Sequence, residues 1–293
     1  MNRTTLPLVV AVGAGALVAV QQRINGDLGR SLHDPLLAAV VSFGSGLAVL
    51  SLLVVRRSAR PALRLLRTTP AWTRVGGLGG ASLVFVGATA APEIGVALLT
   101  VGLVAGSTIG ALLVDGVGLG PGGHRPLTAP RFAGSVLCIG AVLLSAHEGL
   151  RTASALLLAM VVLAGGLISV QQALNGRVRE ATGVLTATFV NFVVGTTALL
   201  LVLGVKELVS GVRADAWPHE PWLYLGGCIG ALFVAVAARV VRVLGVLRLG
   251  LASTAGQIVG AIALDVQRGV SVTTLVAAGL TFLAVAVSGW NRA

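Results

Sequence analysis

The amino-acid sequence predicts an all-α integral membrane protein with ten transmembrane helices, arranged as two inverted five-helix repeats. Its composition indicates the membrane, because 56% of its residues are hydrophobic and only 11% are charged, with a mean hydropathy of +0.96. A soluble domain usually carries about 25% charged residues. The 293 residues accommodate ten apolar spans of roughly 20 residues, which is the length needed to cross a bilayer.

An internal repeat is the second observation. The segment LVAVQQRING at 17–26 returns 150 positions later as LISVQQALNG at 167–176. Further matches pair Phe43 with Phe192, Gly76 with Gly226, Gly95 with Gly245, Gly106 with Gly256, and Asp115 with Asp265. Each half contains five predicted spans, and an odd number places the second copy upside down relative to the first, as in many secondary transporters. Residues 1–150 are therefore expected to form the first repeat and residues 151–293 the second, inverted repeat.

The apolar stretches locate the individual spans. They lie at 6–24, 35–55, 74–91, 95–114 and 131–147, and at 153–173, 184–205, 221–238, 244–264 and 271–290. Only Ala91-Pro92-Glu93 separates the third and fourth spans, which predicts a tight hairpin. The first span has features of a signal peptide, but its counterpart lies in mid-chain, which argues against that interpretation.

Basic residues predict the orientation in the bilayer. With the N-terminus inside, 15 of the 21 basic residues fall on the cytoplasmic side, so the positive-inside rule places both termini in the cytoplasm. The arginine-rich segment 56–67 could also lie on anionic headgroups. Because the arginines occupy short loops between apolar spans, the net charge of +11 does not indicate a nucleic-acid partner.

Amide side chains within the spans are candidates for lining a solute pathway. Gln21 and Asn25 lie one helical turn apart and return as Gln171 and Asn175. Residues i and i+4 share a helix face, and an amide both donates and accepts hydrogen bonds. These groups suit either bonds between helices or a neutral or zwitterionic solute. For Asn25 and Asn175, which lie near predicted span ends, helix capping is the alternative.

Two deeper amides break the symmetry between the halves. Asn191 has Ser42 as its counterpart, and Gln257 has Ser107. Such a difference suits a site for an asymmetric substrate. The predicted substrate-binding residues are thus Gln21, Gln171, Asn191, Gln257, Asn25 and Asn175.

Three acidic residues are candidates for coupling or gating. Asp115 and Asp265 end the fourth and ninth spans at equivalent positions. A carboxylate at a helix C-terminus costs roughly 0.3–1 kcal/mol, so its presence in both halves calls for an arginine partner, a continuing helix or a gating role. A hydrated helix end paired with a loop arginine is the alternative. Glu93, in the predicted hairpin, has Val243 as its counterpart.

The glycine spacing indicates how the helices pack, and the absence of metal-binding and phosphate-binding motifs limits the kinds of function. The 40 glycines include runs spaced four apart, such as Gly102-Gly106-Gly110 and Gly256-Gly260, which favour close helix packing or faces that slide during alternating access. The four histidines and two cysteines have no metal-ligand spacing, and no phosphate-binding motif occurs. We therefore expect no metal and no cofactor, and no ATP-driven pump in this polypeptide.

The QQxxNG element at 21–26 and 171–176 resembles the repeat of YdcZ-type membrane proteins in the drug/metabolite transporter (DMT) superfamily. A PxxGV element at 92–96, followed by Gly106 and Asp115, supports the resemblance and has a degenerate copy at 242–265. Ser107 and Arg242 depart from the pattern and make the halves unequal. The resemblance covers nearly the whole chain in a fused two-repeat form. It implies a DMT/EamA-like multi-pass protein of the bacterial cytoplasmic (inner) membrane that moves small molecules, often called an exporter.

The expected function is therefore a secondary active transporter, not an enzyme. It would export a small organic solute by alternating access, coupled to a proton or ion gradient, through a cavity between spans 1, 3, 4, 6, 8 and 9. Its partners would be the solute and the lipid bilayer, with a homodimer as one arrangement. One alternative is a membrane-embedded scaffold or partner subunit without transport activity. The other, a lipid-acting enzyme, would need converging acids, bases or metal ligands.

Overall fold

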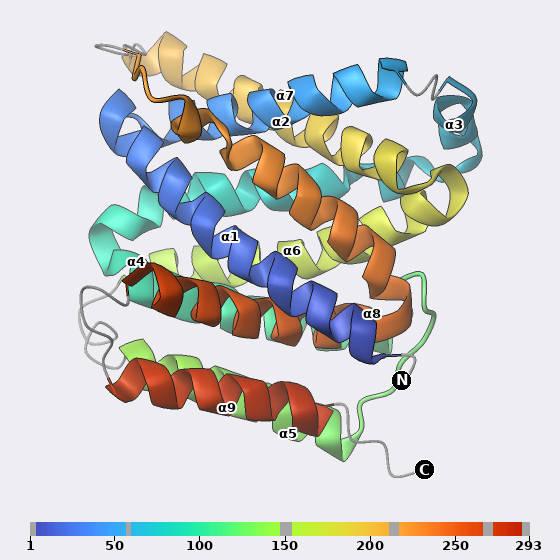
Figure 1. Cartoon of the computed structure of the whole chain (residues 1–293), viewed down its shortest axis with the longest axis vertical. Coiled ribbons are helices and arrows are strands. Elements are labelled where there is room, and N and C mark those ends of the chain that lie inside the picture. Colours follow the sequence, from blue (N-terminus) through green and yellow to red (C-terminus); the bar gives the residue numbers. More distant parts are fainter. Residues whose placement is uncertain (1–3, 57–59, 147–153, 211–216, 266–271, 289–293) are drawn as a thin grey trace.

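The computed structural model describes residues 4–56, 60–146, 154–210, 217–265 and 272–288. Within those ranges the secondary structure is helical and contains no strand. The long helices are α1 (Thr5–Leu32), α2 (Pro35–Arg56), α4 (Gly77–Gly116), α5 (Ala129–Ala146), α6 (Ala155–Thr182), α7 (Val184–Ser210), α8 (Gly226–Asp265) and α9 (Val272–Ser288). The short connecting elements are α3 (Arg60–Leu65), η1 (Leu66–Thr68), η2 (Ala71–Gly76) and η4 (Pro221–Tyr224). Figure 1 shows the long helices stacked as one bundle.

The bundle has the length and the surface of a membrane protein. Among the described residues, five helical stretches are long and apolar enough to cross a bilayer, namely Thr5–Leu32, Pro35–Arg56, Ala155–Thr182, Val184–Val209 and Pro221–Leu264. Large apolar side chains face outward, and Leu201 and Leu208 are 68% and 89% exposed. An extended apolar surface of this kind suits lipid rather than water.

Two helices extend beyond the predicted spans, and this corrects one expectation. α1 continues to Leu32, where His33 adopts a left-handed conformation (φ 52°), and α6 continues to Thr182, before Gly183. The apolar run ends earlier in both cases, but no proline follows it within either helix, and Gly26 and Gly176 are accommodated in the helices. Asn25 and Asn175 therefore lie inside their helices, and the capping alternative is wrong for both.

The predicted third and fourth spans form one helical run, α4, which continues through Ala91–Glu93. Its contacts show that it bends back on itself. Gly79 lies against the carbonyl of Leu167 and Gly106 against that of Val162, two residues little more than one turn apart on α6. A straight helix would separate Gly79 from Gly106 by about 40 Å. The predicted tight hairpin is thus a bend within one helical run that has two arms, which can be followed in Figure 1.

The eighth and ninth predicted spans similarly share α8, which is interrupted at Gly245. Its φ of 77° and ψ of 169° are not helical, and glycine reaches positive φ without the steric cost that a Cβ imposes. The predicted start at 221 is also early, because residues Pro221–Tyr224 form the short η4 before α8 begins.

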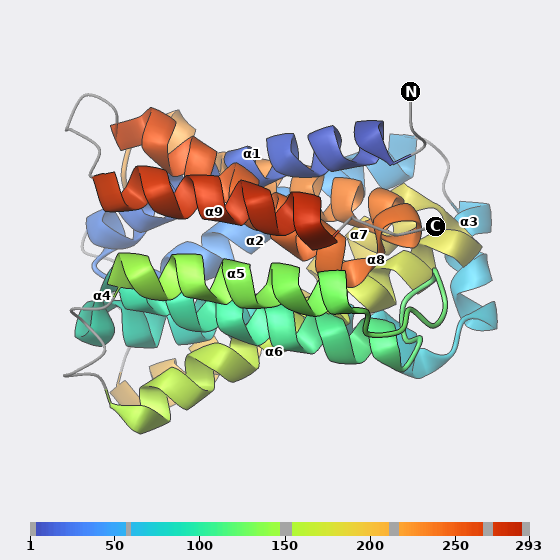
Figure 2. The same ribbon diagram turned by 90° about the horizontal axis from the view of Figure 1, so that it is seen from below.

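Helices of one half pack chiefly on helices of the other. α1 packs on α8, α6 on α4, α2 on α7, and α5 on α9, and Figures 1 and 2 both show α5 and α9 side by side. Equivalent residues make equivalent contacts, because Gly106 lies against the Val162 carbonyl and Gly256 against the Val12 carbonyl. Gly106 and Gly256 are 150 positions apart, and so are Val12 and Val162. The duplicated sequence thus builds a duplicated set of interfaces.

The close contacts at these interfaces predict that adding one methyl group at a glycine lowers the stability of the protein. A Cβ at Gly106 or Gly256 would lie 1.9 Å from the facing carbonyl oxygen, so the helices must move apart. We expect Gly106→Ala and Gly256→Ala each to destabilise the protein by about 1–3 kcal/mol, measured as a lower midpoint of thermal unfolding in detergent. Gly13→Ala is the control, because a Cβ there meets nothing within 4 Å. Equal losses in all three variants would contradict the prediction.

Candidate functional site

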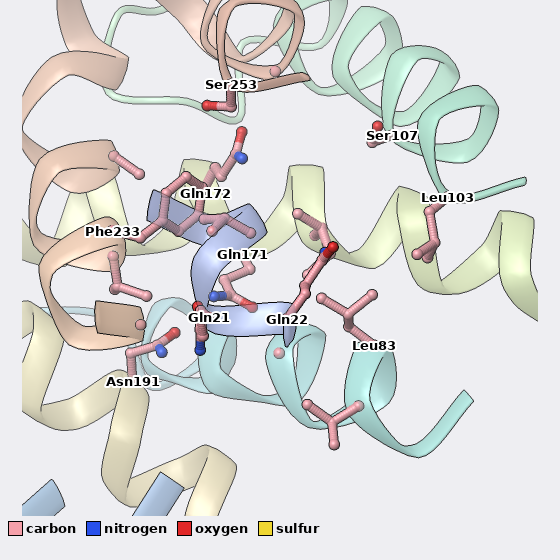
Figure 3. A pocket seen from close by; sticks show the side chains of 18 of the residues that line it. Gln21, Gln22, Leu83, Leu103, Ser107, Gln171, Gln172, Asn191, Phe233 and Ser253 are labelled. Atoms are coloured by element: carbon pink, nitrogen blue, oxygen red, sulfur yellow. The ribbon is translucent and has the colours of Figure 1, made fainter. Parts of the chain in front are cut away.

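A cavity of about 180 Å³ lies at the centre of the bundle. α1, α2, α4, α6, α7 and α8 all contribute to its wall, whereas α5 and α9 supply none of its described lining. The expected spans therefore surround it, and α2 and α7 also contribute, through Ser42, Phe43, Asn191 and Phe192. Figure 3 shows side chains from several of these helices facing this space.

The structure places five of the six predicted amides at the cavity wall. They are Gln21, Gln171, Asn175, Asn191 and Gln257. The sixth, Asn25, is not part of the lining, and its Oδ1 is buried without a hydrogen-bond partner. The α6 amides Gln171 and Asn175 are 7% and 5% exposed.

Several lining residues were not among those singled out from the sequence. Gln22 and Gln172 belong to the same QQxxNG motif, so the motif itself would have pointed to them. The hydroxyl residues Ser42, Ser107, Ser169, Ser253 and Thr254 also line the cavity. The repeat would have pointed to Ser42 and Ser107, the counterparts of Asn191 and Gln257. The other three have no such signal, because serine and threonine are common in apolar helices, where they bond to the preceding turn.

Glycines on the facing helices make room for the amides. Gln21 lies against Gly230, and Gln171 lies against Gly79 and Gly80. The asparagines follow the same pattern, because Asn25 lies against Gly226 and Asn175 against Gly76. The glycines of η2, α4 and α8 therefore do more than bring helix backbones together. They provide space for the polar side chains of α1 and α6.

The hydrogen bonding of the amides differs from one position to the next. Asn175 Nδ2 donates to Asn191 Oδ1 at 2.8 Å, which ties α6 to α7. Asn191 is only 1% exposed, so this bond accounts for its burial. By contrast, Gln171 Oε1 and Gln172 Oε1 are buried without a partner, as are the hydroxyls of Ser42 and Ser253. A buried polar atom left unpaired costs about 1–3 kcal/mol.

Aromatic rings complete one wall of the cavity. Phe43 of α2 and Phe192 of α7 occupy equivalent positions in the two halves, and their ring centroids are 5.1 Å apart. Glycines allow this approach, because Gly46 contacts Phe192 and Gly195 contacts Phe43. The cavity therefore combines an apolar wall with converging amides.

Asp115 lies outside the cavity and caps the second arm of α8. Its Oδ1 accepts a hydrogen bond from the Val246 N–H at 2.9 Å, and its Oδ2 accepts one from the Leu247 N–H at 3.2 Å. Arg131 donates to the same Oδ2 at 2.5 Å. A carboxylate is favourable at a helix N-terminus, which explains why Asp115 is tolerated at the end of α4. The side chain is 3% exposed, so the alternative of a hydrated helix end is wrong here.

Arg125 binds the other side of the same break. Its guanidinium donates to the carbonyls of Arg242, Val243 and Leu244 at 2.8, 3.0 and 3.1 Å. Those carbonyls end the first arm of α8, where a cation is favourable. Burial lowers the pKa of Arg125 from its usual range, and the charge of Asp115 opposes that shift. We refer to Asp115, Arg125 and Arg131 together as the α8 clamp.

The other two acidic candidates are only partly described. Glu93 lies within α4 and Asp265 is the last residue of α8, but their side chains lie outside the described part of the structure. Within that part, no group of three or more histidine, cysteine or acidic residues could hold a metal ion.

The helices and the cavity together define a polytopic membrane protein that encloses a polar site between two related halves. The chain belongs to the family described as "Putative inner membrane exporter, YdcZ", whose profile matches it twice, at residues 6–144 and 156–288. This confirms the resemblance seen in the QQxxNG elements and supports a transporter rather than an enzyme.

Comparison with other proteins adds the fold. No curated protein matches the chain. A solved structure described as "Crystal structure of protein" superposes with a TM-score of 0.69, covering 98% of this chain and 96% of that one. Its sequence identity is 20%, so this likeness shows a shared fold alone.

The contacts of the α8 clamp predict that neutralising Asp115 lowers the stability of the protein strongly. Asp115→Asn removes the charge that Arg131 pairs with in a buried place, and breaking such a pair costs about 3–5 kcal/mol. We expect a clear drop in the midpoint of thermal unfolding. Asp27→Asn is the matched control, because Asp27 pairs with Arg30 at the surface of α1, where a pair contributes at most about 1 kcal/mol. Similar midpoints for both variants would refute the clamp.

Proposed function

We propose that this protein is a secondary active transporter that exports a small organic solute across the inner membrane by alternating access. The observation that carries the proposal is the amide-lined cavity at the centre of an apolar bundle, with its wall built by both halves. Polar groups inside a membrane are costly and generally mark a substrate or ion pathway. Membership of an exporter family supports the same conclusion.

The proposed architecture has ten spans in two inverted repeats. Two observations support it. α4 bends back on itself and α8 is broken at Gly245, so each provides two arms. α1 begins and α9 ends at the same end of the bundle, as both views show (Figures 1 and 2). Five spans in each half would give the two halves opposite orientations.

Inverted topology can be tested at Ser31 and Ala181, which are exposed equivalent positions near the ends of α1 and α6. In a background without Cys138 and Cys228, we expect Ser31→Cys to react with a membrane-impermeant thiol reagent on intact cells. Ala181→Cys should react only after the cells are opened. Reaction of both positions on intact cells would refute the inverted arrangement.

Alternating access requires two arrangements of the same helices around the cavity. Duplicated interfaces support this, because equivalent contacts on the two sides could be exchanged between the halves. The α8 clamp braces the break in α8 with residues of the first half. We infer that it stabilises one of the two arrangements.

The energy source is part of the proposal. Proton or ion coupling needs a group that changes charge during transport. Three acidic residues are the candidates, namely Glu93, Asp265 and Asp115 of the α8 clamp. Since Asp115 is engaged in helix capping, we favour Asp265 or Glu93 for the coupling role.

The alternatives have less support. A lipid-acting enzyme needs a converging acid, base or metal ligand, and the described cavity lining consists of apolar, amide and hydroxyl side chains. A scaffold without transport activity would have no need for an internal polar cavity. Such a cavity costs stability, because several of its buried oxygens have no partner.

The deciding experiment is uptake or efflux of radiolabelled organic solutes by purified protein in liposomes, with and without a pH gradient. We expect Gln257→Ala to reduce the initial rate about tenfold, the effect of losing one hydrogen bond of roughly 1–1.5 kcal/mol. Gln22 also lines the cavity, but it is exposed, so water can replace the hydrogen bonds that Gln22→Ala removes. We therefore expect this variant to cause a smaller loss. Equal losses would refute this assignment, and the absence of any solute movement, with a stable protein partner at purification, would favour the scaffold.

A further inference from the structure

Among the described residues, the polar atoms left unpaired at the cavity are two amide oxygens and two hydroxyl oxygens. Gln171 and Gln172 are both 7% exposed, and the Oε1 atom of each lacks a hydrogen-bond partner. An amide oxygen can only accept, so these two atoms require a donor. The hydroxyl oxygens of Ser42 and Ser253 are also unpaired and lie in the same wall. Figure 3 shows Gln171, Gln172 and Ser253 among the residues around the cavity.

Across the interface with α4, the Gln171 side chain faces glycines. The side-chain amide of Gln171 lies against Gly79 and Gly80, which have no side chain to donate. Both glycines lie in the first turn of α4, which begins at Gly77. Gln171 also lines the cavity, so an occupant of the cavity can supply the donor that its Oε1 lacks.

Charge excludes one large class of occupants. None of the described residues that line the cavity carries a formal charge. An ion brought into such a site would lose its hydration without gaining a counter-charge, which is a penalty of several kcal/mol. The site therefore favours an uncharged solute.

Size and shape narrow the class further. The volume of about 180 Å³ is slightly larger than the roughly 150 Å³ cavity that accommodates benzene. Phe43, Phe192 and Phe233 line it, and aromatic faces pack well against a flat ring. We propose that the cavity selects uncharged, single-ring solutes that carry at least two N–H or O–H donors. This inference deepens the proposed function and rests on it, since it takes the cavity as the solute site.

Two sets of matched probes test the selectivity. Thymine has two N–H donors, 1,3-dimethylthymine has none, and orotate carries a carboxylate on a similar ring. Cyclohexane-1,3-diol and its dimethyl ether make the same comparison without an aromatic ring. With the full-length protein in detergent, we expect at least one donor-bearing probe to bind about tenfold or more tightly than its methylated partner, because two bonds of about 0.5–1.5 kcal/mol each are lost. Orotate should bind more weakly than thymine.

A near-isosteric variant isolates the two oxygens. Gln171→Met together with Gln172→Met removes both unpaired acceptors, and we expect the preference for donor-bearing probes to fall below twofold. The unfolding midpoint should stay equal or rise, because an unpaired buried polar group is removed. Thr196→Val is the control, since Thr196 Oγ1 is likewise buried and unpaired but does not belong to the cavity lining, so the preference should remain at its wild-type value.

The outcomes separate this inference from transport itself. Equal binding of donor-bearing and methylated probes, a preference for orotate, or no binding of either donor-bearing probe would overturn the inference. An unchanged preference in the double Met variant would also overturn it. Selective binding without movement across liposomes would support the selectivity and refute the transporter. Movement of methylated and donor-bearing probes across liposomes at equal rates would support the transporter and refute the selectivity.

Discussion

The fold depends on the close approach of helix backbones at glycines facing the other half of the chain. Gly106 and Gly256 each leave no room for a side chain against a facing carbonyl. In lipid the association of helices relies on packing and polar contacts, because no water is released between apolar surfaces. The same glycine-rich helices, α4 and α8, also receive the amide groups of α1 and α6. Packing and the polar cavity are therefore two results of one pattern.

The sequence predicted the class of fold well, because hydropathy and the repeat are properties of whole segments. The family match and the helical structure agree with it. The ends of the helices could be predicted less well from the sequence. α1 and α6 continue through polar residues such as Asn25 and Asn175, because these side chains lie against glycines of other helices. A hydropathy profile reads only the local sequence and contains no information about the facing glycines.

The candidate site could be predicted only in part, for the same physical reason. The QQxxNG motif identifies Gln171, but its unpaired oxygen depends on the glycines that face it across α4. Asp115 drew attention as a carboxylate at the wrong end of a helix. Its role became clear only with the Val246 N–H beside it, a contact between residues 131 positions apart. Partners so distant in the chain have no local signature.

The clamp on α8 also bears on how the molecule is assembled. Asp115 and Arg125 satisfy backbone groups of residues 242–247, which the ribosome adds more than a hundred residues later. Buried backbone amides and carbonyls need hydrogen-bond partners, so the broken helix cannot reach its final conformation until residues 115–125 are in place. The N-terminal helix waits in turn for the last third of the chain, because α1 packs chiefly on α8. Synthesis of α8 is thus a precondition for the first helix to reach its final place.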